Sequence, residues 1–126
     1  MTRVLIIDDS ELIVQMLTMV CQGEGFEVVS CLGFAEVEEA VRGSSPDVIV
    51  TDLNLPAIPG GDIVAALRTI SQISDRPIVL ISGQPQDTLD RIAAERGAQG
   101  ALSKDAGLPV IASLLPALIH GLLPTR

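Results

Sequence analysis

Residues 4–10 read Val4-Leu5-Ile6-Ile7-Asp8-Asp9-Ser10. Four consecutive aliphatic residues are typical of a strand that is buried on both faces of a parallel sheet. Two acidic residues end this strand, and Ser10 is well placed to cap the helix that the next apolar positions predict. The segment therefore predicts a buried strand, an acidic turn and a helix in succession.

The same alternation of strand and helix patterns continues to the end of the chain. We expect strands near residues 4–7, 26–31, 48–50, 78–81 and 101–102, and helices near residues 12–21, 34–43, 63–70, 86–96 and 108–123. Such alternation predicts right-handed βαβ units. We therefore expect one α/β domain over residues 1–126, with a five-stranded parallel sheet, helices on both faces and the flavodoxin-like strand order 2-1-3-4-5.

Composition narrows the classes of function. The chain has 126 residues, is 48% hydrophobic and contains two Phe but no Trp or Tyr, so its core must be aliphatic. A formal net charge of −8 repels phosphate backbones, so we expect no nucleic-acid binding by this domain. Cys21 and Cys31 fit a reduced, cytoplasmic protein without a disulfide framework. We recognise no signal peptide and no uninterrupted apolar run that could span a bilayer.

Polar residues interrupt the apolar strands at one end only. Asp8 and Asp9 follow the first strand, Asp52 the third, Ser82 the fourth and Lys104 the fifth. The carboxyl ends of parallel strands meet at one edge, where ligands bind in open α/β sheets. We therefore expect these five side chains in one crevice.

This set of residues suits phosphoryl transfer. Crowded carboxylates need a cation, and oxygen ligands suit Mg²⁺. Asp52 follows its strand without an adjacent acid, so it is the natural nucleophile. Lys104 could hold one phosphoryl oxygen and the Ser82 hydroxyl another. Each residue also has an ordinary interpretation, because Asp8 and Asp9 could be helix caps and the others turn or surface residues; their joint position favours the site.

The motifs resemble those of two-component response-regulator receiver domains. The resemblance rests on residues 4–10, on Asp52-Leu53-Asn54-Leu55-Pro56 with Gly60, on Ile81-Ser82-Gly83 and on Ala101-Leu102-Ser103-Lys104. It covers the whole chain. It implies a signalling phosphoacceptor rather than an enzyme with an external substrate, and a phosphohistidine donor on a sensor histidine kinase or a phosphotransfer protein.

The resemblance also assigns roles to individual residues. Asp52 would be the phosphoacceptor, Ser82 the switch hydroxyl and Lys104 the cation that binds the phosphoryl group. Asp9, Asp52 and the backbone carbonyl of Asn54 would hold Mg²⁺, with Asp8 bound through water or behind the direct ligands.

Two positions depart from the family pattern. Ala101 stands where the family usually has an aromatic switch residue, and Asp105 stands where proline usually follows the lysine. A cis bond before a non-proline residue costs about 3 kcal/mol. The Lys104–Asp105 bond is therefore either a strained cis bond or part of an altered loop.

Three classes of function follow. The first is a phosphorylation-dependent receiver that switches binding to a downstream partner. The second is a degenerate receiver that acts as a constitutive interaction or dimerisation domain, which Ala101 and Asp105 favour. The third, a small phosphohydrolase, lacks the cap domain and the second Asp-x-Asp arrangement that such an enzyme would suggest.

The C-terminal segment supports a separate prediction. Residues 106–125 carry no charged side chain, and His120 is their only titratable group. Their apolar residues, which include Leu115 and Ile119, cover more of a helix than one buried stripe needs. We predict a contact surface here, for a two-fold homodimer or for the partner protein. Pro116 should kink this helix or delay its start.

Overall fold

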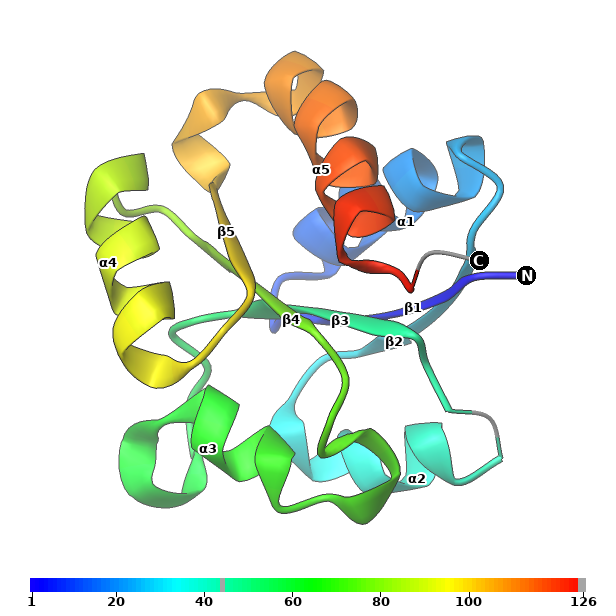
Figure 1. Ribbon diagram of the computed structural model, residues 1–126, viewed down its shortest axis with the longest axis vertical. Helices are drawn as coiled ribbons and strands as arrows, with labels where there is room; N and C mark the ends of the chain where they lie inside the picture. The colour runs from blue at the N-terminus through cyan, green and yellow to red at the C-terminus, as the bar shows by residue number, and fades with distance from the viewer. Residues whose placement is uncertain (44, 125–126) are drawn as a thin grey trace.

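The computed structural model describes residues 1–43 and 45–124. Five parallel strands form one sheet: β1 (Arg3–Ile7), β2 (Glu27–Cys31), β3 (Val48–Asp52), β4 (Ile78–Ser82) and β5 (Gly100–Ser103). Their order is β2-β1-β3-β4-β5, as the sequence predicts. Figure 1 shows β1 and β3 beside each other at the centre and β5 at one edge.

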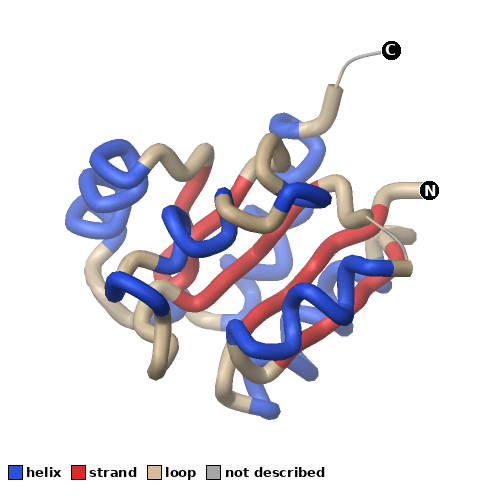
Figure 2. The backbone as a smooth tube through the Cα atoms, turned by 90° about the horizontal axis from the view of Figure 1, so that it is seen from below, coloured by secondary structure: helices blue, strands red, loops and turns tan. Residues whose placement is uncertain are grey.

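Helices cover both faces of this sheet (Figures 1 and 2). Helices α1 (Glu11–Gly23) and α5 (Leu108–Leu122) contribute to one core cluster, and α2 (Val37–Arg42), α3 (Ile63–Arg68) and α4 (Gln86–Arg96) contribute to the other. The predicted second helix begins as a short 3₁₀ turn, Phe34–Glu36, and the third is shorter than expected. Successive strand residues point to opposite faces, so each central strand supplies both clusters.

The core is built from aliphatic side chains, as the composition requires. Every residue of β3 and β4 is buried. Leu5 and Ile7 of β1 face the α2–α3–α4 side, while Val4 and Ile6 face the α1–α5 side. Burial on both faces explains why these strands are continuous apolar runs. The polar residues at the ends of these strands therefore interrupt an otherwise apolar pattern.

Helix α5 packs one face against the sheet, and its orientation corrects one prediction. Leu115 and Ile119 are fully buried, so they are core residues rather than members of an exposed contact surface. The excess apolar residues that remain exposed are Leu108, Val110 and Leu114. Ile111, Leu115 and Ile119 are four residues apart and form the buried stripe of the helix. The other apolar positions lie outside this stripe.

The structure also bears on the start of the last helix and on the peptide bond after Lys104. The helix begins at Leu108 and continues through Pro116, so its start is not delayed, which was one of the two effects that we expected of this proline. Residues on both sides of the proline are anchored in the core, which outweighs one lost backbone hydrogen bond. Among the described residues every peptide bond is trans, including Lys104–Asp105. The chain instead makes a 3₁₀ turn at Lys104–Ala106.

Within residues 1–43 and 45–124, no helix has the length and apolarity needed to cross a bilayer. Both cysteines are free and buried. Burial raises the pKa of Cys21 to about 11, and it does the same for Cys31 with help from the charge of Glu36.

Candidate phosphoryl-acceptor and metal site

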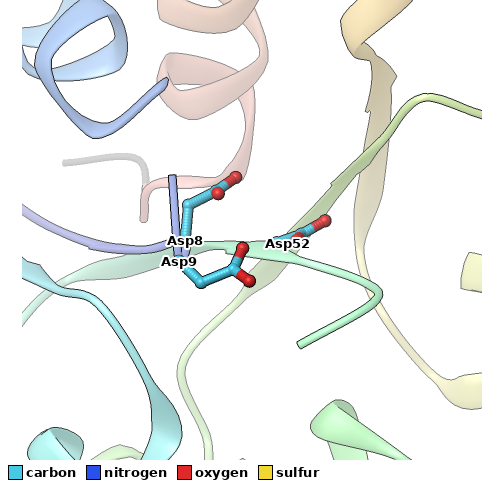
Figure 3. A group of neighbouring side chains, drawn as sticks. All are labelled: Asp8, Asp9 and Asp52. Carbon is cyan, nitrogen blue, oxygen red and sulfur yellow. The ribbon is translucent and has the colours of Figure 1, made fainter. Parts of the chain in front are cut away.

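The acidic residues gather at the carboxyl edge of the sheet. Ile7 of β1 pairs with Thr51 of β3, so Asp8 and Asp9 leave β1 beside Asp52. Carboxylate oxygens of Asp8, Asp9 and Asp52 lie within 4.8 Å of one another. Figure 3 shows the three side chains together at this edge, from the ends of two neighbouring strands. The sheet register therefore produces the acidic cluster.

Asp8 is the fully buried member of this cluster. Its Oδ1 accepts a hydrogen bond from the backbone N–H of Ser10 at 2.9 Å, and its Oδ2 faces the Nζ of Lys104 at 2.8 Å. The N-cap of α1 is Ser10 itself, whose Oγ accepts from the N–H of Ile13. Asp8 thus braces the turn before the helix and also faces the site, whereas Asp9 is exposed.

Lys104 lies between two carboxylates. Its Nζ is 2.8 Å from Oδ2 of Asp8 and 3.3 Å from Oδ1 of Asp52. Burial lowers the pKa of Lys104, but the hydrogen bond with Asp8 and the charges of Asp52 and Asp8 outweigh burial and raise this pKa above its ordinary value. The residue therefore supplies a fixed positive charge at neutral pH.

Asp52 is buried at the end of β3 and is 6% exposed. Burial raises its pKa, the charge of Lys104 opposes this, and the charge of Asp8 adds to it. The backbone N–H of Asn54 and the hydrogen bond from Lys104 lower the pKa again, yet the net result is a raised value. The folded protein therefore disfavours a negative charge on Asp52, even with Lys104 beside it.

Ser82 ends β4 and is 1% exposed. Its Oγ accepts hydrogen bonds from the Nδ2 of Asn54 and from the backbone N–H of Gln84, both at 3.3 Å. The family resemblance implied a role for Asn54 through its backbone carbonyl, and the side-chain contact of Asn54 with Ser82 was not predicted. The contact joins the loop after β3 to the end of β4, and it depends on the folded path of that loop.

Ser103 is a second residue that sequence reasoning missed. It is 5% exposed, and its Oγ donates to the carbonyl oxygen of Gln84 at 2.7 Å. A polar residue at the end of the apolar β5 was the available signal. Lys104 follows Ser103 directly, and the pattern of polar residues after apolar strands selects this lysine.

The donor set fits a hard divalent cation. Three carboxylates crowd together, two of them are buried, and one lysine is the only cation paired with them among the described residues. Oxygen ligands and excess negative charge are what Mg²⁺ sites offer. The carboxylates of Asp8, Asp9 and Asp52 are therefore positioned to hold such an ion.

Residues 4–115 match the family of response regulator receiver domains. The chain belongs to this family. It is 35% identical over 103 residues to the DNA-binding response regulator MtrA of Mycobacterium tuberculosis. The aligned region covers 81% of this chain and 43% of MtrA. It is 33% identical over 125 residues to the transcriptional regulatory protein PrrA of the same species. This aligned region covers 98% of this chain and 51% of PrrA. The receiver thus spans about half the length of these relatives.

Solved receiver structures share the fold. The chemotaxis response regulator CheY4 of Vibrio cholerae matches 94% of this receiver and 98% of its own chain, with a TM-score of 0.78 and 29% identity. A response regulator from Desulfuromonas acetoxidans has a TM-score of 0.80 at 19% identity, a likeness of fold alone. The predicted family and fold are therefore confirmed.

Proposed function

We propose that this receiver accepts a phosphoryl group on Asp52 from a phosphohistidine donor, in a reaction that depends on Mg²⁺. The supporting observation is the arrangement of Asp8, Asp9 and Asp52, whose carboxylate oxygens lie within 4.8 Å of one another, with Lys104 against two of them. This arrangement concentrates negative charge where an acidic nucleophile, a cation and an anionic group must meet.

In the proposed reaction, a carboxylate oxygen of Asp52 attacks phosphorus and forms an acyl phosphate. The bond between phosphorus and the donor imidazole nitrogen breaks, and the electron pair stays on that nitrogen. Lys104 binds a phosphoryl oxygen after leaving its contact with Asp52. The Ser82 hydroxyl accepts both of its present hydrogen bonds, so its own proton is free for another phosphoryl oxygen.

The proposed metal ligands are Asp9, Asp52 and the backbone carbonyl of Asn54, with Asp8 acting through water. Bound Mg²⁺ would supply charge neutralisation for the carboxylates and the transferred group. Asp8 is already engaged with the N–H of Ser10 and with Lys104, which supports a position behind the direct ligands.

The proposed partners are a sensor histidine kinase or a phosphotransfer protein, and a downstream protein whose binding depends on the phosphorylated state. We also propose that residues 1–126 act as one domain and that this domain does not itself bind nucleic acid, in keeping with its charge of −8. A second copy of the chain could dock on α5, because Leu108, Val110 and Leu114 are exposed on a helix whose only titratable side chain is His120. Elsewhere the acidic chain would repel its copy.

Incubation with acetyl phosphate and Mg²⁺, followed by intact mass measurement, tests this function. The wild type should gain one phosphoryl group, and Asp52→Asn should gain none. A wild type that stays unmodified while it still binds its partner would favour a constitutive interaction domain, the alternative that Ala101 and Asp105 support. Steady release of phosphate from an ester would instead favour a phosphohydrolase.

A further inference from the structure

A chain of hydrogen bonds links the loop after Ser82 to the loop after β5. The Oγ of Ser82 accepts from the N–H of Gln84 at 3.3 Å, and the carbonyl oxygen of Gln84 accepts from the Oγ of Ser103 at 2.7 Å. The same Oγ of Ser103 accepts from the N–H of Asp105 at 3.2 Å. Asp105 follows Lys104 directly. One buried hydroxyl therefore joins the chain beyond Ser82 to the chain beyond Lys104.

The side-chain amide of Gln86 fastens helix α4 to the open edge of β5. Its Oε1 accepts from the N–H of Ser103 at 2.9 Å, and its Nε2 donates to the carbonyl oxygen of Ala101 at 3.0 Å. Its Nε2 also donates to Oδ1 of Asp90 at 2.9 Å. β5 is an edge strand, so these backbone groups have no neighbouring strand on that side. The amide takes the place of such a neighbour.

This network surrounds Ala101, a position of β5 that has no bulky side chain. Ala101 has only a methyl group, so a change at Ser82 cannot be relayed by the rotation of a large side chain at that position. Its carbonyl oxygen is instead held by Gln86, the first residue of α4. Ser103 is buried, which makes its hydrogen bonds costly to leave unmade.

We propose that Gln86 and Ser103 are positioning residues that couple the state of Ser82 and Lys104 to helix α4. The inference rests on the proposed function, because it needs a phosphoryl group that draws in both side chains. A shift of Ser82 moves Gln84, whose carbonyl is bound to Ser103. The contact between β5 and Gln86 then changes, and the start of α4 moves with it.

Amide hydrogen exchange on the full chain tests the coupling, with Mg²⁺ alone and with Mg²⁺ plus beryllofluoride as the probe. The wild type should change its exchange in residues 86–96 when the probe binds. Gln86→Ala should lose at least about half of that change and should exchange the Ser103 amide about fivefold faster in the resting state, the effect of one hydrogen bond. Gln84→Ala is the matched control, because the network uses only the backbone of Gln84.

Ser103 gives a second test that a general loss of packing would not reproduce. Ser103→Ala should lose the probe-dependent change in α4, and Ser103→Thr, which keeps the hydroxyl, should restore it. Phosphate uptake from acetyl phosphate should persist in the Gln86 and Ser103 variants. Equal responses in wild type and Gln86→Ala would overturn the coupling while uptake by the wild type leaves the proposed function intact. A wild type without any phosphate adduct would overturn both.

Discussion

Replacing Asp52 by Asn should stabilise the metal-free protein. Asp52 is buried and lies within 4.8 Å of the carboxylate of Asp8, which repels it by about 3 kcal/mol or more at an effective dielectric constant of 20. Lys104 at 3.3 Å attracts Asp52 by about 5 kcal/mol on the same scale. Removing the carboxylate of Asp52 from water costs several kcal/mol in addition to the repulsion by Asp8. Together these two costs exceed the attraction by Lys104.

The raised pKa of Asp52 gives the same direction. A carboxyl whose pKa is higher in the folded state stabilises the protein at low pH, and this contribution is lost as pH rises above the ordinary value of 3.8. At pH 7 the Asn variant escapes that loss, and Lys104 keeps its contact with Asp8. We expect a gain of about 1–3 kcal/mol, or about 4–12 °C in Tm for a domain of this size.

Thermal and urea unfolding in the presence of a chelator measure this gain. The exposed Glu95→Gln is the matched control, because it removes one charge far from the site and should change stability by less than about 0.5 kcal/mol. The advantage of Asp52→Asn should shrink as pH falls, since protonation removes the same charge from the wild type. A variant that melts at or below the wild type at pH 7 would refute the crowding of charges.

Three other predictions follow from the site, the core and the surface. Mg²⁺ should stabilise the wild type by about 2.7 kcal/mol at a hundredfold excess over Kd. Asp9→Ala should remove most of this effect and Asp8→Ala less of it. A melting temperature that does not change with Mg²⁺ would exclude a metal site. Because the pKa of Cys21 and of Cys31 is raised in the folded state, the free energy of unfolding should fall as pH rises from 9 to about 11, by about 2 kcal/mol per thiol. The variant with both cysteines replaced by alanine should lose less stability between pH 8 and 10.5, and a loss equal to that of the wild type would contradict this. Leu114→Glu should abolish self-association in sedimentation without affecting Mg²⁺ binding, whereas a wild type that is monomeric at high concentration would exclude the dimer.

The sequence predicted the sheet and the main site because both follow from position along the chain. Alternating strand and helix patterns give a parallel sheet, and a parallel sheet brings the residues after its strands to one edge. No further information was needed to place Asp8, Asp52, Ser82 and Lys104 at this edge. The strand register brings Asp8 beside Asp52 and the end of β4 beside the end of β3.

The remaining features depend on loop paths and on helix rotation, which patterns determine poorly. Helix α5 has apolar residues on most of its surface, so its periodicity did not select one stripe, and Leu115 was placed on the wrong side. Gln86 contacts Ser103 across 17 positions of sequence, through a side chain that would otherwise be assigned to solvent. The path after Lys104 was left open between two geometries, and the hydroxyl of Ser103 holds the trans turn.

Identification of the phosphorylated residue tests the central claim most directly. The wild type is treated with acetyl phosphate and Mg²⁺, reduced with borohydride to convert an acyl phosphate to a stable alcohol, and then mapped by peptide mass spectrometry. The proposed chemistry predicts a single modified residue, Asp52, and no modification when Mg²⁺ is removed by a chelator. Modification of any other residue, or none on a folded protein with Mg²⁺ present, would contradict it.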